Sequence, residues 1–313
     1  MESTSFKQLL GELEQIPVRQ RVISSFEQIH NKDRERIRQE LERLDNKKSS
    51  NVSDAQSRTS YSLNRFFVIP YNHNRVKLKE GGNDYINATH IKLPDNISTT
   101  KYIATQGPIN HTIGDFWQMV WEQKALTIVM VTKTAEGEYS KCAEYWPSAV
   151  GKPFLPRLSS GSTSVVVTLL DSTHLSAVCP SLVERNFVLT HKLYPGKSRT
   201  VRQLHFTAWP DRGLPKSPEP LVRLIDAMNL GEQFKEDKDS PIIVHCSAGV
   251  GRTGTFILLD AARQYFATHS DYDGDFVADA FKSLREQRMM MVHTLEQFEF
   301  CYQAIDYMLN NKA

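Results

Sequence analysis

One short segment, PIIVHCSAGVGRTGTF at residues 241–256, combines a cysteine, an arginine and several glycines. Cys246 opens its glycine-rich part, and Arg252 stands six positions later. A thiolate is a strong nucleophile, and a planar guanidinium can bind two oxygens of one phosphate group. This spacing therefore predicts a phosphate site in which the sulfur attacks phosphorus while Arg252 stabilises the charge on the oxygens.

The elements on either side of this segment would position both side chains. Residues 241–245 are apolar and mostly β-branched, which predicts a buried strand, and the sequence from Thr253 onward predicts a helix. In a loop between a strand and a helix, backbone N–H groups converge with the helix N-terminus and favour an anion. We therefore expect the loop to bind phosphate and to stabilise the thiolate of Cys246.

Other residues of the segment have supporting roles in this hypothesis. Thr253 is expected to donate its hydroxyl to the sulfur, which helps the sulfur to leave in a second step. His245 is expected to fix the loop by hydrogen bonding rather than to act as a base. The residues expected to surround the phosphate are Ser247, Ala248, Gly249, Val250 and Gly251.

Two other interpretations of the segment explain less of it. GVGRTG matches the G-x-G-x-x-G fingerprint of dinucleotide sites, but the acidic residues about 20 positions later lie in the turn DYDGD instead of ending a second strand. No Gly-Lys-Ser/Thr follows, which excludes a Walker loop. A lone cysteine is most often a buried structural thiol, but the preceding strand, the small residues and Arg252 argue against that interpretation here.

The composition is that of an ordinary globular protein. The 313 residues are 40% hydrophobic and 24% charged, and the formal net charge of +2 is too small to indicate nucleic-acid or membrane binding. The four cysteines lack metal-ligand spacing, and MESTSFKQLL does not resemble a signal peptide. No apolar run approaches ~20 residues. We therefore expect a cytoplasmic protein without a metal, a cofactor or a membrane segment.

The chain divides into three parts by composition. Residues 1–44 are an N-terminal helical segment, residues 45–62 (DNKKSSNVSDAQSRTSYS) are a polar linker, and residues 63–311 are the catalytic domain. Apolar residues in the helical segment recur at three- or four-residue spacing: Val18, Val22, Phe26 and Ile29, then Ile37, Leu41 and Leu44. Its charged stretch KDRERIRQELER is expected to face solvent. The helices either pack on their own domain, which this pattern favours, or serve as a regulatory or docking surface.

Beyond the linker, apolar strands alternate with helices, which indicates an α/β protein with a sheet covered by helices. The predicted strands are 127–132, 164–170, 185–191, 200–208 and 241–245. The predicted helices are 112–124, 218–229, 253–267, 276–288 and 294–310.

The segment HCSAGVGRTG resembles the cysteine-arginine signature of the protein tyrosine phosphatases. Further segments match that family in order: NDYINA (83–88), YIATQGP (102–108), FWQMVWEQ (116–123), KCAEYWP (141–147), HFTAWPDRG (205–213) and RMMMVHTLEQFEF (288–300). The resemblance covers about residues 60–307 and is to the small, intracellular, non-receptor members. It implies a single catalytic domain with a twisted mixed sheet flanked by helices. It also implies hydrolysis of phosphotyrosine in proteins through a phosphocysteine intermediate, without a cofactor.

The resemblance assigns roles outside the loop. Asp211 matches the general acid that protonates the leaving oxygen, on a loop that swings at Trp209 and closes over substrate; without the match, an Asp beside Pro and Gly would be a turn residue. Gln297 matches the glutamine that handles the attacking water, although T-L-E-Q at residues 294–297 is also a capping box. Glu136 and Lys141 match an ion pair that supports Arg252 and the acid loop.

Three positions depart from the family pattern. Phe66 stands where a tyrosine lines the phosphotyrosine slot, in a segment that is one residue short and lacks an acidic residue that grips the substrate backbone. Met290 stands where some members have glycine at the slot rim, which is expected to narrow access. His293 replaces a glutamine that helps to orient water.

Two rival functions remain open at this point. One is a phosphotyrosine-binding module without catalysis, against which Cys246, Arg252 and Asp211 argue together. The other is a dual-specificity or lipid phosphatase, but the loop interior has no lysine for inositol phosphates.

Overall fold

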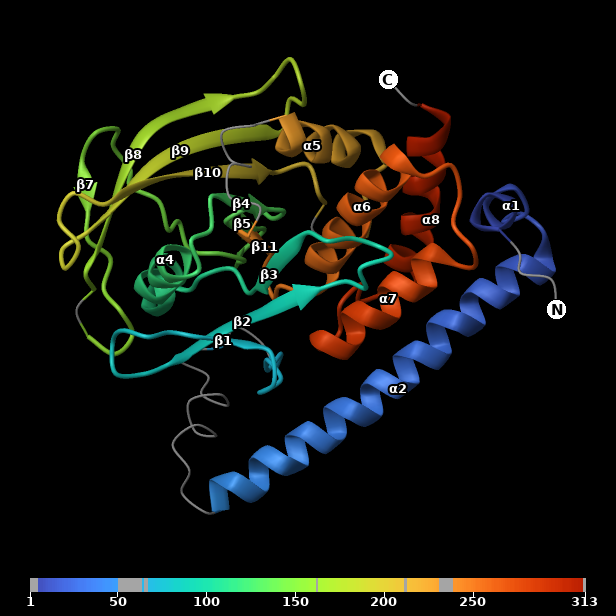
Figure 1. Ribbon diagram of the computed structural model, residues 1–313, viewed down its shortest axis with the longest axis horizontal. Helices are drawn as coiled ribbons and strands as arrows, with labels where there is room; N and C mark the ends of the chain where they lie inside the picture. Colours follow the sequence, from blue (N-terminus) through green and yellow to red (C-terminus); the bar gives the residue numbers. More distant parts are fainter. Residues whose placement is uncertain are drawn as a thin grey trace.

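The computed structural model describes residues 5–49, 64, 67–161, 163–210, 213–230 and 239–311, with side chains described up to residue 44 in the first of these ranges. Its centre is a nine-stranded mixed sheet in the order β1-β2-β3-β11-β4-β10-β9-β8-β7 (Figure 1). The strands are β1 (Arg75–Lys77), β2 (Tyr85–Lys92), β3 (Lys101–Thr105), β4 (Thr127–Met130), β7 (Pro153–Phe154), β8 (Val165–His174), β9 (Leu182–His191), β10 (Ser198–Phe206) and β11 (Ile242–His245). A separate hairpin pairs β5 (Ala135–Glu136) with β6 (Tyr139–Ser140).

The middle of the sheet is parallel and its two sides are antiparallel. β11 pairs in parallel with β3 on one side and with β4 on the other, and β10 pairs in parallel with β4. β2 and β9 then begin the antiparallel flanks. The end of β11, where the cysteine loop starts, therefore lies at the centre of the molecule.

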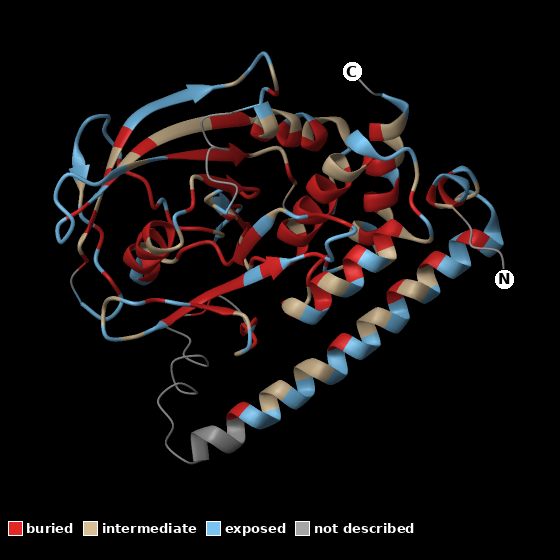
Figure 2. Ribbon diagram, in the orientation of Figure 1, coloured by how far each residue is buried: buried red, intermediate tan, exposed pale blue. Residues whose placement is uncertain are grey.

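Helices cover both faces of the sheet. Successive apolar side chains of β11 point to opposite faces, so each face needs a covering layer. Ile243 points into a core with α4 (Ile113–Glu122), whereas Val244 points into a core with α6 (Gly251–Thr268). The second core also includes α5 (Glu219–Leu230), α7 (Phe276–Gln287) and α8 (Leu295–Asn310). A 3₁₀ turn, η1 (Asn110–Thr112), precedes α4. Figure 2 shows the buried residues concentrated in the sheet and in the inward faces of these helices.

The predicted central and C-terminal elements are confirmed with small shifts at their ends. The sequence did not single out β1, β2 or β3 as strands. β1 has only three residues, and β5, β6 and β7 have two each, so they offer no measurable alternation. β2 begins with a run of buried residues on both faces, and only its last residues alternate.

The N-terminal segment forms two helices that pack on the catalytic domain. α1 (Phe6–Gly11) and the first half of α2 (Ile16–Ser49) contribute Phe6, Val18 and Phe26 to the same core as α6–α8. Figure 1 shows α2 as one long helix that runs past α7 toward β1 and β2. α2 extends to Ser49, five residues into the predicted linker, and residues 50–63 lie outside the described part of the chain.

The expectation that the charged stretch of α2 faces solvent is wrong at one residue. Asp33 is completely buried, whereas its neighbours Lys32 and Arg34 are exposed. The stripe of apolar residues that includes Ile29 and Ile37 passes through position 33, so the packed side of the helix contains a carboxylate.

Candidate active site

The thiol of Cys246 lies at the junction of β11 and α6, where the predicted strand, loop and helix are all present. Its sulfur accepts a hydrogen bond from the Gly249 backbone N–H at 3.3 Å and another from the Thr253 hydroxyl at 3.2 Å. The residue is only 5% exposed. Both donors thus point at one sulfur, next to the N-terminus of an 18-residue helix, which is a setting typical of nucleophilic cysteines.

The loop after Cys246 can follow this path only because Gly249 has no side chain. Gly249 has φ +71°, and a Cβ at this residue would lie 2.0 Å from the Thr105 carbonyl oxygen. Gly107, two residues after Thr105, donates its N–H to the Ser247 carbonyl at 2.9 Å. The loop is thus held against the end of β3 by backbone contacts that any side chain would break.

A buried arginine holds the carbonyl groups of the same loop. Arg288 donates from Nε to the Gly249 carbonyl at 2.8 Å and from Nη2 to the Ala248 carbonyl at 3.2 Å. Its other donors reach Asn87 Oδ1 at 2.8 Å and Thr89 Oγ1 at 3.0 Å on β2. Burial lowers the pKa of Arg288 to about 10, which leaves the guanidinium charged at neutral pH. With their carbonyls bound outward, these loop residues can turn N–H groups toward the sulfur.

His245 fixes the start of the loop through both ring nitrogens. Its Nδ1 lies 3.1 Å from the Cys246 carbonyl and its Nε2 lies 2.8 Å from the Tyr145 hydroxyl. A carbonyl only accepts, so Nδ1 carries the proton and Nε2 accepts from Tyr145. Burial raises the pKa of Tyr145 well above its ordinary value, so its hydroxyl remains a donor. Both ring nitrogens are hydrogen-bonded, so His245 is placed to fix the loop rather than to act as a base.

Arg252 presents its fork toward a buried carboxylate. Nη1 donates to Glu136 Oε1 at 2.6 Å and to Thr132 Oγ1 at 3.1 Å, and Nη2 donates to Glu136 Oε2 at 3.3 Å. Nη2 also donates to the Pro210 carbonyl at 2.8 Å. Lys141 completes the group, with Nζ 3.4 Å from Glu136 Oε2. The contact with Pro210 connects the guanidinium to the segment that carries Asp211.

The loop that contains Asp211 is described only at its ends. Trp209 is buried and donates from Nε1 to the Gly213 carbonyl at 3.3 Å, which closes the loop upon itself. Its ring packs near Phe300 of α8, with ring centroids 6.4 Å apart. Asp211 and Arg212 lie outside the described residues. One end of this loop thus contacts Arg252 through Pro210, and the other end is bonded to Trp209.

Gln297 lies over the start of α6, close to the cysteine loop. Its Oε1 accepts from the His293 backbone N–H at 2.8 Å, and a Cβ on Gly251 would lie 2.8 Å from the same oxygen. Thr294 caps α8 by accepting from the Gln297 N–H at 3.3 Å. Of the two hydrogen bonds of the predicted capping box, only the one accepted by the Thr294 side chain is present. The Gln297 side chain accepts from the backbone N–H of His293 instead of that of Thr294. Its amide nitrogen remains near the loop.

The comparisons with known proteins agree with this geometry. Residues 62–307 match the family model described as protein-tyrosine phosphatase, which covers most of the chain. The chain belongs to the protein-tyrosine phosphatase family. It is 38% identical over 265 residues to the receptor-type tyrosine-protein phosphatase C of Rattus norvegicus, covering 81% of this chain and 19% of that protein.

Relatives of other types are equally similar. The tyrosine-protein phosphatase non-receptor type 61F of Drosophila melanogaster is 36% identical over 259 residues, covering 82% of this chain and 45% of that protein. A human protein named phosphatidylinositol phosphatase PTPRQ is 38% identical over 267 residues, covering 83% of this chain and 10% of that protein. The chain thus spans less than half the length of these relatives. In the described part of the chain, no helix is long and apolar enough to cross a membrane.

The three departures from the phosphatase pattern have different outcomes. Met290 adopts φ 62°, a left-handed conformation that glycine adopts without strain, and its half-buried side chain packs against the apolar cluster that includes Val250. His293 is exposed; partial desolvation of its ring and the charge of Arg285 lower its pKa. Phe66 lies outside the described residues, so the aromatic of the slot is not placed.

Sequence reasoning missed two buried arginines, of which Arg288 binds the cysteine loop. Arg288 and Arg285 both lie in the stretch SLREQRMMM and are almost completely buried. Their partners are backbone carbonyls and residues far away in sequence, which no local pattern reveals. The signal that could have been noticed is the carboxylate of Asp33 at an apolar position of α2, because a buried charge requires a partner. Among the described residues, no cluster of His, Cys, Asp or Glu is arranged to hold a metal ion.

Proposed function

We propose that this chain hydrolyses phosphotyrosine in proteins through a covalent phosphocysteine intermediate. One observation carries the proposal: the Cys246 sulfur accepts hydrogen bonds from the Gly249 N–H and the Thr253 hydroxyl at the N-terminus of α6. These donors hold the sulfur in the place where a bound phosphate would meet the helix N-terminus. Phosphotyrosine hydrolysis is the activity of the family to which the chain belongs.

In the first step, the thiolate of Cys246 forms a bond to phosphorus and the bond from phosphorus to the tyrosine oxygen breaks. The protonated carboxyl of Asp211 gives its proton to the departing oxygen, so that tyrosine leaves neutral. Arg252 binds two of the phosphoryl oxygens and stabilises the charge that they carry in the transition state.

In the second step, the carboxylate of Asp211 takes a proton from a water molecule, whose oxygen forms a bond to phosphorus. The phosphorus–sulfur bond breaks, inorganic phosphate is released and the sulfur leaves as a thiolate. Thr253 lowers the cost of that departure because its hydroxyl already donates to the sulfur at 3.2 Å. Gln297 is the residue that we propose to place the water, since its side chain lies against Gly251.

Wider assignments belong to the same proposal. Residues 63–311 form the catalytic domain, and the core packing of α1 and α2 favours their being part of its surface rather than a separate docking module. The protein acts in signal transduction on phosphotyrosine-containing proteins and resides in the cytoplasm, a location supported by the likeness to a non-receptor phosphatase. Cell fractionation tests the location.

The nucleophile is tested by Cys246→Ser, with Cys179→Ser as a matched control in a buried cysteine away from the loop. Cys246→Ser is expected to abolish hydrolysis of phosphotyrosine peptides while peptide binding persists, because a hydroxyl is a far weaker nucleophile of nearly the same shape. Cys179→Ser is expected to remain active. Residual activity of pure Cys246→Ser near that of the control would overturn the assignment.

The substrate class is tested with three probes: a phosphotyrosine peptide, the same peptide with phosphoserine, and a phosphoinositide dispersed in detergent. A deep anion site favours the long phosphotyrosine side chain, so the first probe is expected to be hydrolysed fastest. Faster hydrolysis of the phosphoinositide would favour the lipid-phosphatase alternative. Comparable rates on the two peptides would favour dual specificity, and peptide binding without turnover would favour a binding module.

A further inference from the structure

Two residues beside the cysteine loop have a backbone conformation that their side chains disfavour. Met290 has φ 62° and Val292 has φ 51°, and Val292 is β-branched. A β-branched residue in the left-handed region is strained, and such strain persists only where surrounding contacts hold it. The segment from Met289 to His293, here called the Met-rich turn, joins α7 to α8.

The Met-rich turn is in contact with the catalytic elements. The Val292 N–H donates to the Val250 carbonyl at 3.3 Å, and a Cβ on Gly254 would lie 2.5 Å from the Val292 nitrogen. The turn ends at His293, whose N–H holds the Gln297 side chain at 2.8 Å. The position of Gln297 over Gly251 therefore depends on the path of the turn.

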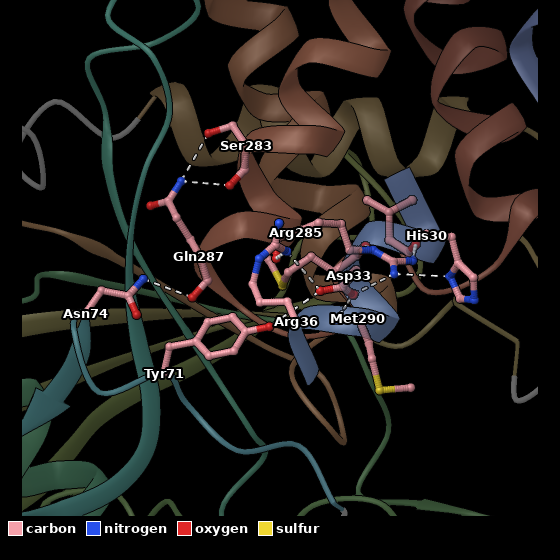
Figure 3. Close-up of polar contacts among 11 residues, drawn as sticks. His30, Asp33, Arg36, Tyr71, Asn74, Ser283, Arg285, Gln287 and Met290 are labelled. Atoms are coloured by element: carbon pink, nitrogen blue, oxygen red, sulfur yellow. Dashed lines mark hydrogen bonds and ion pairs between the residues drawn. The ribbon is translucent and has the colours of Figure 1, made fainter. Parts of the chain in front are cut away.

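A single carboxylate from the N-terminal helix holds this path. Asp33 Oδ2 accepts from the Met290 backbone N–H at 3.1 Å and from Arg285 Nη1 at 2.8 Å (Figure 3). Arg285 in turn donates to the Met291 carbonyl and, from Nη2, to the Val292 carbonyl at 2.8 Å. The two charged side chains thus bind the backbone of three consecutive residues of the turn.

The other oxygen of Asp33 is also fully used. Oδ1 accepts from Arg36 Nη1 at 3.3 Å and from the Tyr71 hydroxyl at 3.5 Å, and Arg36 also donates to the Arg285 carbonyl at 3.0 Å (Figure 3). The side chains of Asp33 and Arg285 are each 1% exposed. A buried ion pair costs desolvation that an apolar pair would avoid, so its presence at an apolar position of α2 is not explained by stability alone.

We propose that Asp33 is a positioning residue for hydrolysis of the phosphocysteine intermediate, acting through Arg285 and the Met-rich turn on Gln297. The inference rests on the proposed function. Without the carboxylate, Met290 and Val292 relax from their left-handed conformations, His293 moves and Gln297 no longer lies over Gly251. The second step then slows, whereas formation of the phosphocysteine, which depends on Cys246 and Arg252, is little changed.

The test separates positioning from stability by replacing both members of the ion pair. In the double variant Asp33→Leu/Arg285→Met, apolar side chains take the place of two buried charges, which keeps α2 packed on the domain. A matched control, Asp226→Leu/Arg263→Met, removes an ion pair of 2.8 Å between α5 and α6 that is not in contact with the turn. Thermal unfolding establishes that each variant is folded.

Rapid mixing with an aryl phosphate, followed by steady-state kinetics, gives the deciding readout. The Asp33/Arg285 variant is expected to release a burst of phenol near one equivalent per enzyme, with kcat lowered about tenfold or more and kcat/KM within about threefold of the parent. The Asp226/Arg263 control is expected to keep the parent kcat. Addition of Cys246→Ser to either variant is expected to remove the burst.

A purely structural role gives a different pattern. The proposal is overturned if kcat and kcat/KM of the Asp33/Arg285 variant fall by the same factor and its burst amplitude falls in proportion. It is also overturned if this variant is folded and keeps the parent kcat. Where the double variant does not fold, Asp33→Asn carries the same test, since it keeps the shape and removes the charge. A wild-type protein that does not turn over, or a Cys246→Ser variant that does, would instead refute the proposed function.

Discussion

At the scale of single residues, the two side chains proposed to act on phosphate are each held by more than one hydrogen bond. The sulfur of Cys246 has two donors, and the guanidinium of Arg252 is bound by Glu136 and the Pro210 carbonyl. Glu136 thus fixes the Arg252 side chain before a phosphate binds. Phosphate binding therefore costs less side-chain conformational entropy. Substitutions at these positions should act on catalysis more than on folding.

Arg252→Lys is expected to lower kcat/KM for a phosphotyrosine peptide roughly 10²–10³-fold, because an ammonium is a point charge and cannot replace the bidentate fork. The control is Arg263→Lys on the same helix, whose side chain pairs with Asp226 at the surface and should leave kcat/KM nearly unchanged. Steady-state kinetics of both variants decide. An Arg252→Lys enzyme within a few-fold of the parent would contradict the proposed role.

Asp211→Ala is expected to lower kcat roughly 10²–10⁴-fold while phosphotyrosine peptides still bind, because the carboxyl acts on the leaving group and not on the phosphate. The defect should shrink for aryl phosphates whose phenols are already acidic, since these leave without a proton. A series of aryl phosphates of graded phenol acidity measures this. An equal loss across the series would show that Asp211 is not the general acid.

At the scale of elements, the path of the cysteine loop depends on glycine. Gly249→Ala is expected to abolish activity and to destabilise the fold by about 1–3 kcal/mol or more, since a Cβ would lie 2.0 Å from a carbonyl oxygen in addition to the strain of φ +71°. The matched control is Gly196→Ala, which has φ +81° but open space around the new Cβ. Urea unfolding and activity of the two variants separate the backbone strain from the clash. Equal effects in both would contradict a requirement for close approach.

Long, periodic elements could be predicted from the sequence, whereas their partners could not. Strands β8–β10 and helices α4–α8 have enough residues to show an apolar pattern, whereas the four-residue strands β4 and β11 were predicted from short apolar runs. Each lies within a few residues of its predicted place. The motif containing Cys246 and Arg252 likewise identified the loop. What escaped prediction depends on tertiary contacts: Arg288 binds carbonyls of the loop, and Asp33 is buried only because α7 and the Met-rich turn lie against it.

At the scale of the whole molecule, a buried histidine makes stability depend on pH. His205 donates from Nε2 to the Thr132 carbonyl at 2.8 Å, and its Nδ1 lies 3.3 Å from Arg185 Nη1, so only the neutral ring satisfies both partners. Burial, with a contribution from the Arg185 charge, lowers the pKa of His205 from 6.5 to about 4. The unfolded chain therefore binds this proton more tightly than the folded protein does.

We expect the contribution of His205 to the free energy of unfolding to be present above pH 6.5. This contribution is expected to fall as the pH drops toward 4. Between pH 7 and pH 5 the loss from this group is about 2 kcal/mol. Urea unfolding at several pH values measures it, and His205→Gln, which keeps a donor for Thr132, should show a shallower dependence. An unchanged slope in that variant would assign the pH effect to other groups.

The strand order of the sheet also determines when during synthesis the protein can become active. β11 lies between β3 and β4 and is the last strand of the described sheet to leave the ribosome, more than a hundred residues after the strands that it pairs with. Until then, β1-β2-β3 and β4-β10-β9-β8-β7 are two unjoined sheets with unpaired inner edges. The same strand carries Cys246 at its end, so its insertion joins the two sheets and places the nucleophile in one event. The nucleophile is therefore placed beside its hydrogen-bond donors only when the sheet is closed.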